Sequence, residues 1–217
     1  GAAWASGINL YATILTLGLM SSLGYASLPP GLEILNDPLV LATAGCMYFV
    51  EFFADKTPGV DTGWDGLHTF IRIPAGALLA AGAASGFYVS QAAQLAAGLV
   101  GGGLAAGSHF AKAGSRVLIN TSPEPVTNWT ASFAEDIAVI GGLWAALNHP
   151  WIFLGLLVVF VLIAIWALPK LWYAITQLFR KIGRFFGAGQ SDQEEALADR
   201  RKDVLGKLYK DARDKPD

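Results

Sequence analysis

Six apolar segments, each long enough to cross a lipid bilayer as a helix, constrain this chain more than any other feature. A hydrocarbon core about 30 Å thick needs roughly 20 apolar residues in helical conformation, because each residue adds about 1.5 Å. The segments cover residues 4–25, 38–55, 65–86, 92–118, 127–147 and 151–176. The sequence therefore predicts an all-α polytopic membrane bundle of about six transmembrane helices.

Composition agrees with a membrane bundle and excludes several other classes. Hydrophobic residues make up 53% of the chain and charged residues only 15%, with much of the charge near the C-terminus, so the remainder is too apolar for a soluble domain. We interpret residues 4–25 as a first span and not as a signal peptide, because a basic start and a small-residue cleavage site are missing. Cys46 is the single cysteine, which excludes a disulfide framework and a cysteine-based metal site. The net charge of −2 gives no reason to expect a nucleic-acid partner.

The basic residues predict an orientation. If the six segments alternate, the N-terminus, the second and fourth connectors and the C-terminal region share one side, and every Lys and Arg belongs to that side. The opposite connectors (28–37, 87–91 and 148–150) contain none. The positive-inside rule then predicts that both termini are cytoplasmic.

We divide the chain into a bundle, residues 1–178, and a cytoplasmic tail, residues 179–217. The tail begins with apolar and basic residues typical of an interfacial amphipathic turn: Leu178, Phe179, Arg180, Lys181, Ile182, Arg184, Phe185 and Phe186. After Gly187 and Gly189, residues 191–215 predict a solvated charged helix with Ser191 as its N-cap. A thin apolar stripe (Leu197, Val204, Leu208) could dock a partner, although such tails are more often only solvated.

Two polar hairpins on the basic side resemble each other. Aligned without gaps, Thr57-Pro58 falls on Ser122-Pro123, Thr62 on Thr127, and Trp64 on Trp129. This predicts an internal repeat, which is parallel if both connectors lie on one side of the membrane. An inverted repeat would require a re-entrant segment, for which the Gly-rich residues 99–107 are the candidate.

Helical spacing places the charges of these hairpins on shared faces. Glu51 and Asp55 are four residues apart, and the series Asp65, His68, Arg72 and His109, Lys112, Arg116 are spaced by three and four. Ionisable groups are costly in hydrocarbon and normally face a bundle interior or a watery cavity. Two interpretations stay open: a polar network that ties the hairpins together, or a polar cavity for a substrate or ion. The number and clustering of the charges favour the cavity.

Two sets of residues make up the candidate site. The substrate-binding set attracts an anionic small molecule or a lipid phosphate and lines the mouth of the site: Lys56, Arg72, Lys112, Arg116, His68, His109, Trp64 and Trp129. The acidic set holds those bases in place or relays protons: Glu51, Asp55, Asp65, Glu135 and Asp136.

Other chemistry has less support in the sequence. A metal site at His68 and His109 lacks a third nearby His and a His-x-x-x-His pattern. Ser108 and Ser115 lie near His109, but no nucleophile elbow accompanies them. A phosphate-binding Gly-Lys-Ser/Thr loop does not occur. We therefore predict no catalytic residue, metal or cofactor, and favour a protein that is not an enzyme.

Several polar strings resemble a known family. They are ASGINLY at 5–11, LPPGLE at 28–33, VEFFADK at 50–56, DGLHTFIR at 65–72, KAGSR at 112–116 and NTSPEPVTN at 120–128, with Glu135 and Asp136. In these strings the chain resembles the bacterial multi-pass membrane proteins grouped as domain of unknown function 4126, over roughly its first 170 residues. The resemblance implies a location in the bacterial inner (plasma) membrane and carries no activity or site residue.

The leading hypothesis is a small transporter, channel or lipid-handling protein with a charged site near the cytoplasmic face. The alternative is a non-transporting scaffold or assembly protein whose tail recruits a partner, and an intramembrane enzyme ranks third. Membrane lipids are expected partners. Gly- and Ala-rich helices would permit close packing of a homo-oligomer without requiring it.

Overall fold

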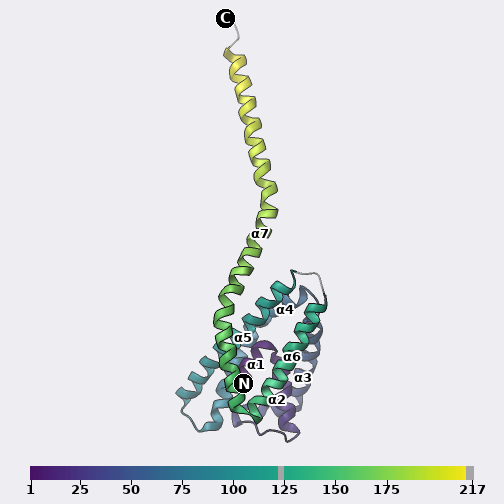
Figure 1. Ribbon diagram of the computed structural model, residues 1–217, viewed down its shortest axis with the longest axis vertical. Helices are drawn as coiled ribbons and strands as arrows, with labels where there is room; N and C mark the ends of the chain where they lie inside the picture. Colours follow the sequence, from purple (N-terminus) through teal and green to yellow (C-terminus); the bar gives the residue numbers. More distant parts are fainter. Residues whose placement is uncertain (122–124, 214–217) are drawn as a thin grey trace. The chain divides into compact units, whose positions relative to one another are not determined.

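The computed structural model describes the backbone of residues 1–121 and 125–213 and the side chains of residues 1–121, 126–181 and 183. Over these residues the protein is helical and contains no strand, which confirms the all-α class. In chain order the elements are α1 (Ala2–Ile8), α2 (Leu10–Ser22), the 3₁₀ helix η1 (Pro30–Asn36), α3 (Pro38–Ala54), α4 (Val60–Ala84), the 3₁₀ helix η2 (Ser85–Phe87), α5 (Gln91–Ile119), α6 (Pro125–Asn148) and α7 (Pro150–Arg213) (Figure 1).

Three helical stretches are long and apolar enough to cross a membrane: Val60–Phe87, Val126–Asn148 and Pro150–Lys181. A fourth is counted if η1 and α3, which meet at an angle of 69°, form one broken span. These apolar helices indicate a membrane protein. The count of six spans stays a prediction. α5 is not among the candidates, because its glycines and its polar side chains, among them His109, Lys112 and Arg116, make it less apolar.

The predicted first span is two helices and not one. Asn9 separates α1 from α2 in an extended conformation, with φ −147° and ψ 102°. Its side-chain Oδ1 accepts a hydrogen bond of 2.9 Å from the Ala12 amide and so caps α2. The Thr13 hydroxyl donates to the Asn9 carbonyl at 2.8 Å. The apolar pattern of residues 4–25 continues through this break, which is why the pattern predicted a single helix.

Small residues let α1 pack directly against α4 and α5. A Cβ added to Gly7 would collide with Ser108 and with the Ala105 carbonyl, and one added to Gly76 would collide with Ala105. The Ser108 hydroxyl donates to the Trp4 carbonyl at 2.8 Å, which ties α5 to α1. Dispersion contacts between closely approaching backbones are the main apolar attraction available inside a membrane.

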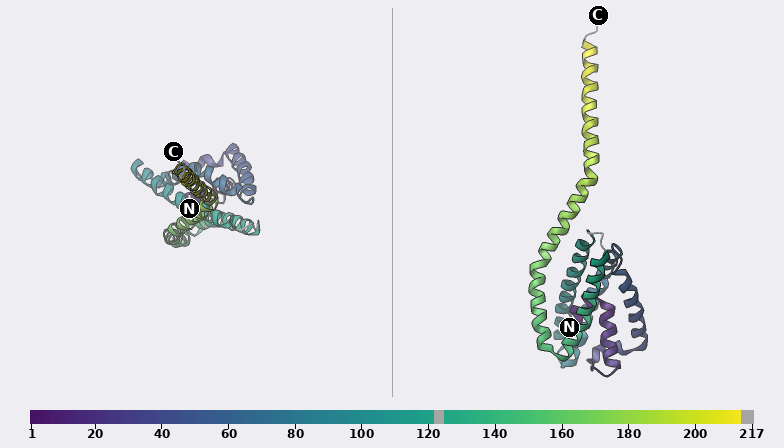
Figure 2. Two further views of the ribbon diagram at one scale, coloured as in Figure 1. Left: turned by 90° about the horizontal axis from the view of Figure 1, so that it is seen from above. Right: turned by 45° about the vertical axis from the view of Figure 1, so that its right-hand side comes forward.

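The connections around α3 and α4 have clear local causes. The Asp37 carboxylate accepts from the Leu39 amide at 2.8 Å and caps α3, and Pro38 occupies the first turn. Gly59, with φ +84°, precedes α4. The end of α3, the start of α4, the end of α5 and the start of α6 all lie at the same end of the bundle (Figure 2).

The chain divides into a unit of residues 1–172 and a second unit of residues 173–217. α7 extends through Arg213 as one helix, so a new helix does not begin at Ser191, and Gly187 and Gly189 do not interrupt it. The prediction of a separate tail helix was wrong in this respect, because those glycines lower helix propensity without preventing helix. Ser122, Pro123 and the side chains of Leu197, Val204 and Leu208 lie outside the described residues, and the internal repeat stays a prediction.

Candidate functional site

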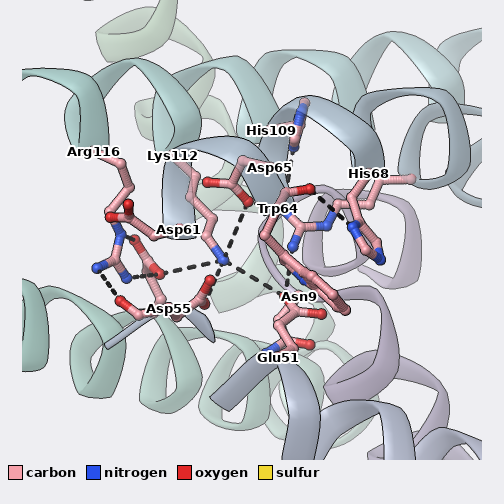
Figure 3. Close-up of polar contacts among 12 residues, drawn as sticks. Asn9, Glu51, Asp55, Asp61, Trp64, Asp65, His68, His109, Lys112 and Arg116 are labelled. Atoms are coloured by element: carbon pink, nitrogen blue, oxygen red, sulfur yellow. Dashed lines mark hydrogen bonds and ion pairs between the residues drawn. The ribbon is translucent and has the colours of Figure 1, made fainter. Parts of the chain in front are cut away.

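Four helices contribute charged side chains to one cluster, with Lys112 near its centre (Figure 3). Helical spacing aligns Glu51 with Asp55 at the end of α3, and Lys112 with Arg116 on α5. The Lys112 Nζ lies 2.6 Å from Asp55 Oδ2, 3.5 Å from Glu51 Oε1, 3.7 Å from Asp65 Oδ1 and 3.6 Å from Glu135 Oε2. One ammonium group is therefore shared by four carboxylates from α3, α4 and α6.

Arg72 joins α4 to α3 by two ion pairs. Its Nη2 lies 2.5 Å from Glu51 Oε1 and its Nη1 lies 2.8 Å from Asp65 Oδ1. The Arg72 side chain is fully buried, and α4 belongs to a candidate span. A guanidinium there is tolerable only with such partners, because an isolated buried charge is very costly.

Arg116 closes the other side of the cluster with a bidentate contact. Its Nε and Nη2 donate to the two carboxylate oxygens of Glu135 at 3.2 and 2.6 Å. Its Nη1 donates to the carbonyls of Asp55 and Asn128, both at 3.0 Å. One fully buried side chain thus holds the end of α3 and the start of α6 against α5.

A chain of amides extends this arrangement toward the start of α4. The Asn128 Nδ2 donates to Asn120 Oδ1 at 2.9 Å, and the Asn120 Nδ2 donates to Asp61 Oδ1 at 2.7 Å. Asp61 is fully buried and also accepts from the Gly59 amide at 2.9 Å. Sequence reasoning missed Asp61, Asn120 and Asn128. Their position in polar strings was visible, but the search followed charges at helical spacing.

The two histidines of the cluster are neutral donors and acceptors. The Thr69 hydroxyl donates to the Asp65 carbonyl at 3.1 Å, so it accepts from His109 Nε2 at 2.7 Å. This assigns the proton to Nε2 and leaves Nδ1 of His109 to accept from Arg72 Nη1 at 3.2 Å. Both ring nitrogens of His109 are therefore occupied by hydrogen bonds to protein groups.

His68 is hydrogen-bonded as the other neutral tautomer, which carries its proton on Nδ1. Its Nδ1 donates to the Trp64 carbonyl at 2.9 Å, so its Nε2 accepts from the Tyr11 hydroxyl at 3.1 Å. The Trp64 ring stacks on His68 with centroids 4.3 Å apart. In the described part of the chain no group of three or more His, Cys, Asp or Glu side chains could hold a metal ion.

Lys56 is placed apart from the other three bases. Its Nζ donates to Ser132 Oγ at 3.1 Å and lies 3.0 Å from the ring centroid of Phe52 and 4.5 Å from that of Phe133. Among the described side chains it has no carboxylate within 4 Å. Burial lowers the pKa of Lys56, and the nearby Asp136 opposes this effect. Trp129, 48% exposed, lies on the same side, 5.7 Å from Nζ, whereas Trp64 lies at the cluster.

The helix break at Asn9 is also connected to the acidic residues. The Asn9 Nδ2 donates to Asp136 Oδ1 at 3.2 Å, while its Oδ1 caps α2. Asn9 is 1% exposed and Asp136 is 8% exposed. The single residue that interrupts α1 and α2 is thereby fastened to α6.

Comparison with known proteins gives the family. A family model described as domain of unknown function (DUF4126) matches residues 1–170. The chain belongs to the DUF4126 family. The match confirms the resemblance seen in the sequence and includes every member of the charged cluster. No curated protein and no solved structure matched the chain.

Acids outnumber bases at this DUF4126 site. Six carboxylates (Glu51, Asp55, Asp61, Asp65, Glu135, Asp136) accompany four bases (Lys56, Arg72, Lys112, Arg116), an excess of two; Glu135 alone is more than 8% exposed. Among the residues that the structure describes, four buried carboxylate oxygens have no hydrogen-bond partner: Glu51 Oε2, Asp55 Oδ1, Asp61 Oδ2 and Asp65 Oδ2. The site thus has unused acceptors, while Arg72, Lys112 and Arg116 are each within 2.8 Å of a carboxylate.

Proposed function

We propose that this DUF4126 protein is a small membrane transport protein that binds and releases protons at the carboxylates around Lys112. The observation that carries the proposal is the excess of two carboxylates over bases at the site, where five of the six carboxylates are buried. Among the described residues, one oxygen each of Glu51, Asp55 and Asp65 has no hydrogen-bond partner. Uncompensated charge in a low-dielectric site is costly, and proton uptake is the simplest way to remove it. Ionisable groups inside membrane helices commonly form such proton relays.

Lys112 supplies the element that would respond to a proton. Its ammonium lies between 2.6 and 3.7 Å from four carboxylates, so protonation of one of them weakens that ion pair and favours the others. Asp55 is the nearest partner, and its second oxygen, Oδ1, has no hydrogen-bond partner among the described residues. A proton on Asp55 would therefore release Lys112 toward Glu51, Asp65 and Glu135.

The broken first helix gives further support. Discontinuous helices occur at the substrate and ion sites of many secondary transporters, because their ends offer unpaired backbone groups near the middle of the membrane. Here Asn9, at the break, donates a hydrogen bond to Asp136, so a change of charge on that carboxylate would act directly on the junction between α1 and α2. Opening of the site toward the cytoplasm, with both termini on that side, is part of the proposal.

An anionic substrate, expected from the four basic residues, is the less favoured occupant. It would have to displace a carboxylate within 2.8 Å from Arg72, Lys112 or Arg116. An added negative charge would also raise the existing excess of acids.

Proton flux into proteoliposomes tests the proposal. Purified wild type, Asp55→Asn and Glu33→Gln are reconstituted with an internal pH-sensitive dye, and a pH gradient with a counter-ion path is imposed. Asp55→Asn keeps the shape of the side chain but replaces the carboxylate with an amide, which cannot carry a proton in a relay, so we expect at least a tenfold loss of flux. Glu33 is an exposed acid in η1, and its variant should match wild type. Wild-type flux no greater than in empty liposomes would refute proton transport, and full flux in Asp55→Asn would refute the role of Asp55 in it.

A scaffold is the second candidate, favoured by the way the ion pairs connect α3, α4, α5 and α6. Under this alternative, removal of residues 191–217 abolishes the cellular phenotype while the bundle remains folded and Asp55→Asn has no functional effect. Loss of the phenotype in Asp55→Asn with the tail intact supports transport instead.

A further inference from the structure

A cavity of about 300 Å³, the α2–α3 cavity, lies between α2 and α3. Its lining comes from these two helices: Tyr11 and Ile14 on α2, and Leu39, Val40, Thr43 and Ala44 on α3. Leu39 is 75% exposed and Thr43 is exposed as well, so the cavity opens at the surface of the bundle. Tyr11 and Thr43 carry hydroxyl groups, which can hydrogen-bond to water.

The α2–α3 cavity lies away from the polar connectors. Its α3 residues belong to the first two turns of that helix, whereas Glu51 and Asp55 are at the other end of it. Thr43 and Glu51 are eight residues apart, about 12 Å along a helix. The end of α3 leads into a polar connector, and the start of α3 lies at the opposite end of the bundle (Figure 2). The cavity therefore approaches the charged cluster from the side opposite to the opening proposed above.

Tyr11 belongs both to the lining of this cavity and to the polar contacts of the cluster. Its hydroxyl donates to His68 Nε2 at 3.1 Å, and the two rings meet edge to face with centroids 5.7 Å apart. His68 is 5% exposed and lies eight residues beyond the start of α4, so Tyr11 contacts the cluster well inside the bundle. Glu51 and Arg72 are close enough to Tyr11 to interact with it electrostatically. One side chain thus lines the cavity and contacts the cluster.

Glu51 is the carboxylate that can exchange a proton with water beside Tyr11. Its Oε1 is paired with Arg72 and lies 3.5 Å from Lys112 Nζ. Its Oε2 is buried and has no hydrogen-bond partner among the described residues. Buried acceptors of this kind are commonly satisfied by ordered water. Water that passes Tyr11 from the cavity would therefore find an acceptor that belongs to the Lys112 cluster.

We propose that the α2–α3 cavity is the second opening of the proton site, and that Tyr11, held by His68, keeps this opening closed. This role of Tyr11 depends on the proposed function, because a transport protein must connect its site with each side of the membrane in turn. When the Tyr11–His68 hydrogen bond breaks, water from the cavity reaches Glu51. A hydronium ion then transfers one proton to Oε2, which leaves neutral water and a neutral carboxylic acid, and the reverse step restores the carboxylate.

Cysteine accessibility tests the opening. In a Cys46→Ser background, Thr43→Cys places the single thiol of the chain at the cavity. Ala42→Cys is the matched control, because Ala42 is exposed on the same helix and does not line the cavity. Both variants are reconstituted, treated with a membrane-impermeant trimethylammonium methanethiosulfonate, and assayed for proton flux, with labelling measured by mass spectrometry. We expect Thr43→Cys to be labelled and to lose at least fivefold in flux, and the flux of Ala42→Cys to be unchanged.

Three outcomes of this experiment would overturn the second opening. They are a Thr43→Cys thiol that the reagent does not reach, full flux in the labelled Thr43→Cys protein, and an equal loss of flux in Ala42→Cys. Wild-type flux no greater than in empty liposomes would refute proton transport and this opening with it. Flux that is lost in Asp55→Asn but not on labelling of Thr43→Cys would overturn the opening alone.

Tyr11→Phe tests the closing role. It keeps the ring and removes the hydrogen bond to His68, so the closed arrangement is less favoured. We expect proton flux and the labelling rate of Thr43→Cys to rise about three- to tenfold, the factor that corresponds to the loss of one hydrogen bond. Tyr25→Phe is the control, because Tyr25 is 75% exposed and does not line the cavity. Flux in Tyr11→Phe no higher than in Tyr25→Phe would overturn the closing role.

Discussion

The charged cluster and the apolar region between α1, α6 and the start of α7 are built in opposite ways. In the cluster, Arg72, Lys112 and Arg116 each contact two or more groups on other helices, and all are buried. Between α6 and α7 the space is filled partly by edge-to-face rings and partly by a cavity. Lipid tails are as apolar as the helices, so apolar burial alone gives little preference for one helix arrangement in a membrane. The comparison indicates that polar contacts define the arrangement of α3 to α6, whereas the packing beside the start of α7 is apolar and leaves a cavity.

The largest expected effect is at Lys112. Lys112→Met leaves Asp55 and its neighbours without their shared cation, and removal of one partner from a buried ion pair costs about 3–5 kcal/mol. We expect a loss of that size in the free energy of unfolding, measured by denaturant titration in detergent micelles.

Lys56→Met is the matched control for Lys112→Met. Lys56 has no ion pair among the described side chains, and its desolvated cation–π contacts are worth about 1–2 kcal/mol. Equal destabilisation by the two substitutions would mean that the ion pairs of Lys112 contribute no more to stability than the ring contacts of Lys56.

A smaller effect is expected where the cluster reaches the helix break. Asn9→Ala removes the cap of α2 and the hydrogen bond to Asp136, for a loss of about 1–2 kcal/mol. Asn9→Asp keeps the cap but places a second carboxylate beside Asp136. Its unfolding free energy should fall further at pH 8 than at pH 5, because the two carboxylates repel each other only when both are charged. A pH-independent loss in Asn9→Asp would argue against direct contact between residues 9 and 136.

The smallest effect is expected at the cavity between α6 and α7. A Cβ at position 141 meets no atom within 4 Å, and the position borders the apolar cavity, so for Gly141→Leu we expect the free energy of unfolding to change by less than about 1 kcal/mol, in either direction. Thermal unfolding of Gly141→Leu is compared with that of Gly155→Leu, because Gly155 is an exposed glycine of α7 whose added Cβ also meets no atom within 4 Å. A loss of unfolding free energy as large as that of Lys112→Met would mean that the region between α6 and α7 tolerates substitution as poorly as the charged cluster does.

Much of the cluster could be predicted because its charges recur at helical spacing. Arg72, Lys112 and Arg116 were placed together with Glu51, Asp55 and Asp65 on this basis, and the structure brings all six into contact. Lys56 was grouped with them as a neighbour in sequence, yet its side chain lies against Phe52 and Phe133. Spacing within a helix does not determine on which side of a loop a residue after the helix end will lie.

The uncharged members could not be predicted in the same way. Asn9, Asn120 and Asn128 have no periodic partner, and their roles depend on tertiary contacts with Asp136, Asp61 and Arg116. Hydropathy averages over about twenty residues and therefore does not register one extended residue between two helices. The same averaging predicted six spans, of which the structure identifies three, or four with the broken pair.

The close approach of α1 to α4 and α5 has a consequence for the history of this sequence. A methyl group at position 7 or 76 has no room, since backbone and small side chains already occupy the space. Mutations to Ala at these positions, which need only one base change, should be eliminated by selection even though Ala favours helix. Homologues that diverge freely along α7 should therefore still carry glycine at both positions, and a homologue with a larger residue at one should carry a compensating change at position 105 or 108.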